Sequence, residues 1–155
     1  MEMLCLGKYR KLALAIYIIL LVSWLSFIFF NSALDANNSA QQSDKIVNIV
    51  ENIVHTINPD AVVDSASVRK SAHFFEFGVL GVLYFIGTLF FKNKRFYFYT
   101  HLLFLSFLTA FLDESLQLFS DGRGAEITDV WIDFSGASIG ILIMFLIFYG
   151  KKILK

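Results

Sequence analysis

Three features that are common in proteins are nearly absent from this chain. Cysteine occurs once, at Cys5, so no disulfide can form within the chain. The 13 basic and 13 acidic residues cancel, and the lack of net charge gives no support to a nucleic-acid partner. Internal repeats and low-complexity tracts are also missing, which excludes a repeat array. We therefore predict a single domain over residues 1–155.

Apolar side chains, in contrast, are abundant. Hydrophobic residues make up 57% of the chain, against about 45–50% in soluble domains. Four apolar runs each approach the roughly 20 residues that a helix needs to cross a bilayer, and only a helix satisfies its own backbone there. The predicted fold is all-α, a four-helix transmembrane bundle with spans at residues 12–30, 72–91, 96–119 and 130–149.

The first apolar run has a basic start, at Lys8, Arg10 and Lys11, as a signal peptide does. The run is longer, however, than the roughly 7–15 apolar residues of a signal core, and no clear small-residue cleavage site follows it. We therefore interpret residues 12–30 as a retained membrane anchor.

The distribution of basic residues predicts the orientation of the spans, because such residues concentrate on the cytoplasmic side of a membrane. Both ends and the turn at residues 92–95 are predicted to be cytoplasmic, an N-in, C-in arrangement. Residues 31–71 and 118–129 then lie outside. The cytoplasmic group holds nine of the 13 basic residues: Lys8, Arg10, Lys11, Lys92, Lys94, Arg95, Lys151, Lys152 and Lys155.

The outer connection contains a predicted amphipathic helix at residues 39–57. Its apolar residues recur at helical spacing on one face, with Asn38 or Ser39 as the expected N-cap and Pro59 just past its end. This helix either lies on the outer leaflet or packs on the bundle to bury its apolar face. The next helix is expected to be capped by Asp64 or Ser65.

Polar residues gather at the outer ends of the second, third and fourth spans. An ionisable group at membrane depth costs several kcal/mol and is kept where it is paired, hydrated or used. Pairs such as His73 and Glu76, or Asp129 and Asp133, have the spacing that shares a helix face. We predict an external polar pocket from ten residues: Arg69, Lys70, His73, Glu76, Asp113, Glu114, Gln117, Arg123, Asp129 and Asp133.

This layer suggests binding of an anionic group. Arg69 and Lys70 lie in the first turns of a helix, where the macrodipole disfavours cations but where a bound anion would be stabilised. Arg123 lies between two glycines and could hold a phosphate or carboxylate in a bidentate fashion.

Two alternatives remain open. His73, Glu76, Asp113 and Asp129 could ligate a divalent cation that activates water toward a phosphoester, although no H-E-x-x-H spacing occurs. Alternatively, the charges only pin the helices together. With the loop acids Asp121 and Glu126 set aside, five acids face three bases, which implies a proton, cation or water in the layer.

Two sequence blocks resemble the VanZ-like family of bacterial integral membrane proteins, and the resemblance covers roughly residues 12–149. Asp121 replaces a proline that is usual in the family, and Asp133 replaces a frequent asparagine, which adds a negative charge. The blocks are Arg69-Lys70-Ser71-Ala72-His73-Phe74-x-Glu76-Phe77-x-x-Leu80-Gly81 and Asp113-Glu114-x-x-Gln117-x-Phe119-x-x-Gly122-Arg123-x-x-x-Ile127-x-Asp129-x-x-x-Asp133-x-x-Gly136.

The resemblance implies a multi-pass protein of the bacterial cytoplasmic membrane. Some members are associated with resistance to lipoglycopeptides such as teicoplanin, but the resemblance supplies no settled reaction. We expect a binding protein with no cofactor, whose partners are membrane lipid, a lipid-linked cell-wall precursor or a lipoglycopeptide. The alternative is a membrane-embedded hydrolase or transferase that acts on a lipid-linked phosphate, using a divalent cation or acid/base groups.

Overall fold

The computed structural model describes residues 2–34, 36–57, 63–91 and 96–153. Within these ranges the chain forms five helices and no strand, which confirms the all-α prediction. Three of the described helices contain segments long and apolar enough to cross a membrane: Tyr9–Ala33, Ser65–Thr88 and Ile127–Tyr149. The helices are α1 (Glu2–Ala33), α2 (Ala36–Ile57), α3 (Ser65–Thr88), α4 (Phe96–Gln117) and α5 (Ile127–Ile153).

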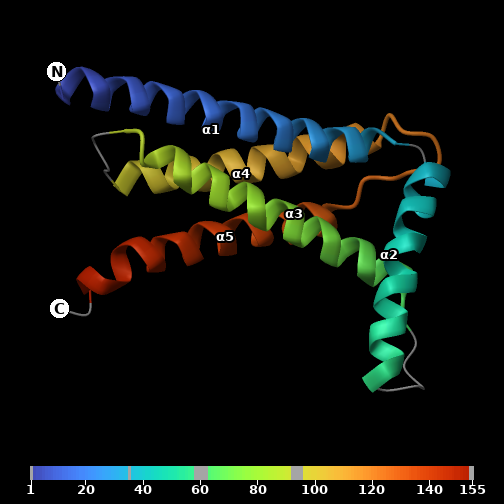
Figure 1. The fold of residues 1–155 in the computed structure, drawn as a ribbon. Helices are drawn as coiled ribbons and strands as arrows, with labels where there is room; N and C mark the ends of the chain where they lie inside the picture. The colour runs from blue at the N-terminus through green and yellow to red at the C-terminus, as the bar shows by residue number, and fades with distance from the viewer. Residues whose placement is uncertain (1, 35, 58–62, 92–95, 154–155) are drawn as a thin grey trace.

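Helices α1, α3, α4 and α5 run along one another in an elongated bundle, and α2 crosses one end of it (Figure 1). The start of α1 and the end of α5 lie at the opposite end. There the Arg10 guanidinium donates a hydrogen bond of 2.7 Å to the Phe90 carbonyl, which ties α1 to the end of α3. Arg10, from the basic group before the first span, therefore lies at this end of the bundle, whereas the basic turn at residues 92–95 lies outside the described residues.

Helix α3 begins at the predicted cap. The Asp64 carboxylate accepts hydrogen bonds from the backbone N–H groups of Ala66 and Ser67, at 3.3 and 3.0 Å. Together with the Ser67 hydroxyl, these bonds lower the pKa of Asp64. Because α3 starts at Ser65, before the apolar run at 72–91, Arg69 and Lys70 belong to the same helix as His73.

Helix α2 is longer than the predicted amphipathic segment, since it begins at Ala36 rather than at residue 39. Val50 and Val54 are half-buried and border a groove shared with the start of α3. Ile49 and Ile53, in contrast, are about 60% exposed. The apolar side of α2 is therefore divided between the bundle and the surroundings.

Helices α3 and α5 form the closest pair in the bundle. A Cβ atom added at Gly81 would overlap the Ala137 carbonyl, and one at Gly140 would overlap the Gly78 carbonyl. A Cβ at Gly136 would likewise overlap the backbone at Phe74. Small residues at these positions let the two backbones meet, as expected for close helix packing in membranes.

The buried core runs between α3, α4 and α5 and reaches α1 at few positions. Within it the hydroxyls of Tyr84 and Thr109 share a hydrogen bond of 2.8 Å. Helix α1 buries Ile28 but leaves much of its apolar surface open, with Ile19 and Phe30 about 65% exposed. A continuous apolar surface of this kind is expected on a helix that faces lipid. The buried apolar residues are Ile28, Phe77, Leu80, Tyr84, Phe85, Leu102, Ala110, Val130, Ala137 and Ile141.

Substitution of Gly140 by Ala should lower the free energy of unfolding by about 1–3 kcal/mol, because the new methyl group must displace the α3 backbone. Gly78→Ala is the matched control, since its Cβ would lie 3.7 Å from the Gly136 carbonyl oxygen, an ordinary contact. It should leave stability equal or slightly higher, because Ala favours helix. Unfolding by denaturing detergent measures both, and equal losses would contradict the close packing.

Candidate functional site

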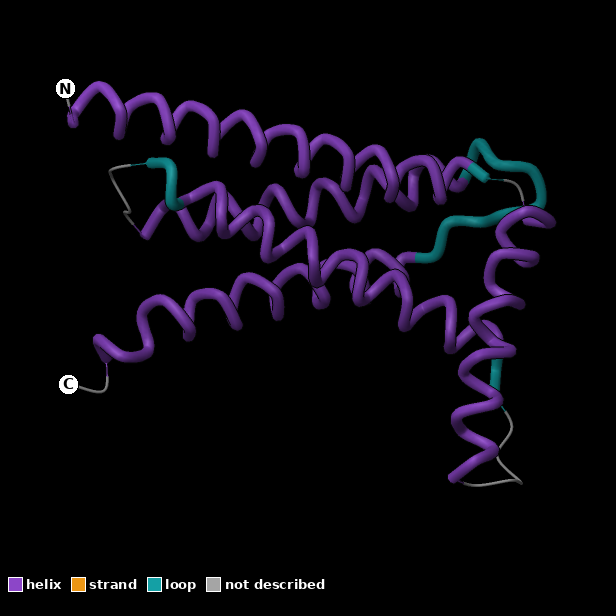
Figure 2. The backbone as a smooth tube through the Cα atoms, viewed as in Figure 1, coloured by secondary structure: helices purple, strands orange, loops and turns teal. Residues whose placement is uncertain are grey.

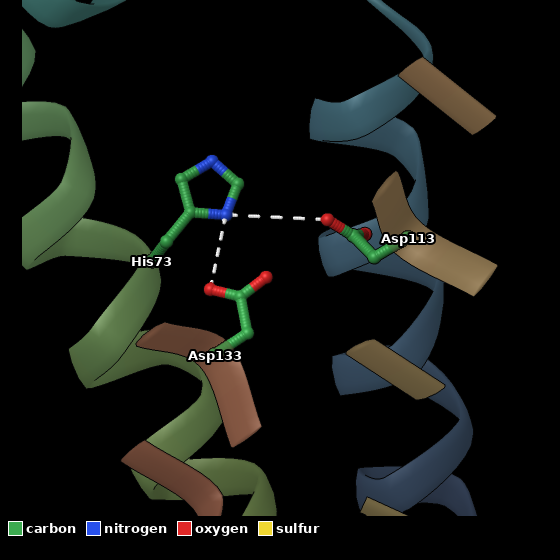
Figure 3. Close-up of side chains that lie close together, drawn as sticks. All are labelled: His73, Asp113 and Asp133. Atoms are coloured by element: carbon green, nitrogen blue, oxygen red, sulfur yellow. Dashed lines mark ion pairs between the residues drawn. The ribbon is translucent and has the colours of Figure 1, made fainter. Parts of the chain in front are cut away.

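Three polar side chains from three helices meet near the α2 end of the bundle: His73 of α3, Asp113 of α4 and Asp133 of α5 (Figure 3). The His73 Nδ1 atom lies 4.0 Å from Asp113 Oδ2 and 3.8 Å from Asp133 Oδ1. Both aspartates have no exposed surface. We call these three residues the inner cluster.

The inner cluster is held in place but is not internally satisfied. The Ser32 hydroxyl at the end of α1 donates a hydrogen bond of 2.6 Å to Asp113 Oδ2. Within the described residues, His73 Nδ1, Asp113 Oδ1 and both Asp133 oxygens have no hydrogen-bond partner. Buried polar atoms without partners are costly, so this group needs a physical explanation beyond helix pinning.

A second group, which we call the outer network, is satisfied by its own members. The Lys70 ammonium lies 2.6 Å from Asp129 and 3.1 Å from Glu126. The Glu114 carboxylate accepts from the Gln117 amide at 2.6 Å and from the Glu126 backbone N–H at 3.1 Å. The hydrogen bond and the charge of Lys70 lower the pKa of Glu126. These acids are therefore committed to partners outside the inner cluster.

Arg123 joins the loop between α4 and α5 to the end of α1. Its Nη1 atom donates to the carbonyls of Asn31, Ser32 and Leu34, at 3.0, 3.4 and 3.4 Å. Asn31 and Ser32 lie in the last turn of α1, where carbonyls lack partners within the helix, and Leu34 follows directly after α1. The loop turns at Gly122, whose φ of 74° suits glycine, and it passes the end of α1 before entering α5 (Figure 2).

Burial lowers the pKa of the Arg123 guanidinium, and the charge of Arg69 lowers it further. The two arginines thus repel each other across a small distance, while Asp113 and Glu114 offset part of this effect. Because an arginine in a protein stays protonated, Arg123 contributes a positive charge to the electrostatic potential at this loop. Its three hydrogen bonds to Asn31, Ser32 and Leu34 all use one nitrogen of a group that carries five N–H donors.

Two cavities near the inner cluster share lining residues. The outer cavity has a volume of about 380 Å³, and Arg69, Gln117, Arg123 and Glu126 are among its lining residues. The inner cavity, of about 70 Å³, is bordered by Arg69 and Arg123 and also by His73 and Glu76. Since the two arginines line both cavities and His73 belongs to the inner cluster, the three features are contiguous.

The ten residues predicted from the sequence therefore separate into three places. His73, Asp113 and Asp133 form the inner cluster; Lys70, Glu114, Gln117 and Asp129 lie in the outer network; Arg69, Glu76 and Arg123 border the inner cavity. The cation ligands suggested by the sequence were His73, Glu76, Asp113 and Asp129; the group whose donor atoms lie within 4.8 Å of one another comprises His73, Asp113 and Asp133.

Two contributors were missed in the sequence. Ser32 is absent from the predicted pocket, although the polar pair Asn31-Ser32 directly follows the first apolar run and is a usable signal. Glu126 was set aside as a loop acid, yet it binds Lys70 and its amide binds Glu114. Its position one residue before α5 places it at a helix start, where a carboxylate is stabilised.

Fold and site together define a helical, membrane-type protein with a buried polar cluster between its helices. The chain belongs to the VanZ/LLP1 family, whose model matches residues 16–148. This match confirms the resemblance inferred from the two sequence blocks. No curated protein and no solved structure matches the chain significantly.

Replacement of Ser32 by Ala should lower the free energy of unfolding by about 1–3 kcal/mol, because the buried Asp113 carboxylate loses a hydrogen bond. Ser135→Ala is the control, since the Ser135 hydroxyl binds its own helix at an exposed position and should matter little. Both can be measured by thermal unfolding in detergent. Equal stability of the two variants would show that the Ser32 contact does not support the cluster.

Proposed function

We propose that this protein binds the anionic headgroup of an amphiphilic envelope molecule, such as a phospholipid or a lipid-linked cell-wall precursor, in the outer cavity. The observation that carries the proposal is the pair of half-buried guanidiniums, Arg69 and Arg123, on the wall of one cavity. A guanidinium pair matches the geometry and charge of a phosphate or carboxylate.

Electrostatics supports an anion at this position. Arg69 lies in the second turn of α3, where the helix dipole disfavours a cation, and its charge disfavours protonated Arg123. A bound anion would relieve both unfavourable interactions. Glu126 and Asp44 also border the cavity, but the charge of Glu126 is offset by Lys70.

An apolar groove beside the polar cavities supports an amphiphile over a free anion. The groove has a volume of about 530 Å³ and is bordered by Val50 and Val54 of α2 and by Val68 and Phe75 of α3. Ile46, Val68 and Ala72 border both this groove and the inner cavity. A headgroup beside the arginines would leave its hydrocarbon chain next to this apolar surface.

The proposed setting is the bacterial cytoplasmic membrane, crossed four times by α1, α3, α4 and α5, with both ends inside and α2 outside. Helix α4 is not among the three candidate spans found in the described part of the chain, and Asp113, Glu114 and Gln117 occupy its last turns. Its place alongside the three candidates (Figure 1) supports its inclusion. The positions of the basic residues support the direction.

A narrower proposal is a contribution to glycopeptide or lipoglycopeptide resistance. Some VanZ-like proteins are associated with teicoplanin resistance, and this chain belongs to the family.

The inner cluster favours a second candidate, a metal-dependent hydrolase or transferase that acts on a lipid-linked phosphate. His73 of this cluster borders the inner cavity together with Arg69 and Arg123, so a phosphate held by the arginines would lie near the cluster. This candidate requires a divalent cation bound by the inner cluster.

Topology can be tested with single cysteines at Asn52 and Asp121, with Cys5 replaced by Ser. Both side chains are exposed, so an impermeant thiol reagent should label them in whole cells if they lie outside. A cysteine at Asn93 should react only after the membrane is opened. Labelling of position 93 alone in intact cells would invert the orientation and remove the external cavity.

Lipid binding can be tested with Arg69→Gln and Arg123→Lys. Each should weaken the retention of phosphatidylglycerol roughly tenfold, since a hydrogen bond to a charged group contributes about 1.5–3 kcal/mol and a lysine cannot form a bidentate fork. Native mass spectrometry with phosphatidylcholine as competitor measures the preference. The same variants should reduce lipoglycopeptide tolerance in cells at equal amounts of folded protein.

Lys70→Gln is the matched control, because Lys70 neighbours Arg69 but is engaged by Glu126 and Asp129. It should retain the preference for the anionic lipid. If all three variants lose this preference equally, general surface charge explains the binding and the cavity does not. If the loss of lipid binding and of lipoglycopeptide tolerance in each variant is proportional to its loss of stability, the two arginines have only a structural role.

A further inference from the structure

We propose that His73, Asp113 and Asp133 bind one divalent transition-metal cation. The site goes beyond headgroup binding, since it lies deeper in the bundle and its occupancy can be measured without any lipid. The argument rests on three independent properties of the inner cluster: the spacing of its donor atoms, their burial without partners and their chemical type.

The spacing suits an ion and excludes direct hydrogen bonds. Nδ1 of His73 lies 3.8 Å from Asp133 Oδ1 and 4.0 Å from Asp113 Oδ2, which is too long for a hydrogen bond. Two ligands that each bind a metal at 2.0–2.2 Å are at most about 4.4 Å apart, so both distances fit one ion. All three donors lie within 4.8 Å of one another, and a small side-chain movement brings the last pair into range.

Burial makes a positive charge at this position favourable. The two carboxylates have no exposed surface, and three of their four oxygens have no hydrogen-bond partner in the described part of the chain. Two nearby cations are committed elsewhere, since Lys70 binds Glu126 and Asp129 and Arg123 binds the end of α1, while Arg69 lines the cavities next to the cluster. A divalent cation would neutralise both carboxylates and occupy the imidazole lone pair.

The donor set indicates the class of cation. One imidazole nitrogen and two carboxylates, without a thiolate, suit Mn²⁺, Fe²⁺, Co²⁺ or Zn²⁺, whereas Ca²⁺ and Mg²⁺ prefer oxygen alone. The Ser32 hydroxyl orients Asp113, as polar neighbours of metal ligands commonly do. Three protein ligands leave further positions open, and His73 borders the inner cavity through which water or a ligand could reach them.

The test uses the full chain purified in detergent, stripped with a chelator and reloaded with Zn²⁺ or Mn²⁺. Elemental analysis should find about one ion per chain, the stoichiometry of a single three-ligand site. Asp133→Asn and His73→Gln should each weaken the affinity by more than about tenfold, a loss already seen when only the neighbours of ligands are changed. Calorimetry for Zn²⁺ and electron paramagnetic resonance for Mn²⁺ give the affinities.

Asp129→Asn is the matched control, because it makes the same chemical change one turn earlier on α5, in the outer network. It should bind the cation as the unchanged protein does. Size-exclusion profiles check folding, and Asp113→Asn replaces any variant that aggregates. Absence of a stoichiometric ion from the unchanged protein overturns the site, as does an equal loss in Asp129→Asn. The cation site would also be overturned if Asp133→Asn raised the melting temperature of the protein and added metal did not change it. That result would indicate a proton shared between Asp113 and Asp133.

Discussion

The close approach of α3 and α5 is the constraint on which the rest of the structure depends. Gly136 of α5 meets the α3 backbone at Phe74, directly beside His73, and Asp133 lies one turn before Gly136. The register that brings these backbones together therefore also brings an imidazole and a carboxylate together. Because glycine contacts tolerate little sliding or rotation, the geometry of the inner cluster is set by backbone packing rather than by the attraction of its own charges.

Much of the fold was visible in the sequence, because hydrophobic runs, a cap and helix direction are local signals. The runs predicted the helices, Asp64 was expected as the cap of α3, and the alternation of direction placed polar residues near one end. The division of these residues into two groups was not predictable. It depends on how far α3 and α5 are shifted along each other: Asp129 meets Lys70, and Asp133, one turn later on the same face of α5, meets His73.

The count of acidic and basic residues could not predict which acids lack partners, for a physical reason. The sequence assigns the excess of acidic over basic residues to one polar layer. In the structure, Glu126 and Glu114 have partners within the outer network, and the carboxylate oxygens without hydrogen-bond partners belong to Asp113 and Asp133. Glu126, set aside as a loop acid, supplies both a carboxylate for Lys70 and an amide for Glu114. A net count cannot distinguish a neutralised surface group from a buried one, although the free-energy costs of the two differ widely.

The manner in which α1 is attached has a consequence for how the sequence can vary. Its apolar surface is largely exposed, and it joins the bundle through directed polar contacts: Arg10 with Phe90, Trp24 with Glu76, Ser32 with Asp113, and its last carbonyls with Arg123. In lipid, apolar helix surfaces have little preference for one another over the acyl chains. Exchange among Leu, Ile, Val and Phe at the exposed positions of α1 should thus be nearly neutral, while the polar contacts and the buried Ile28 determine where the helix docks.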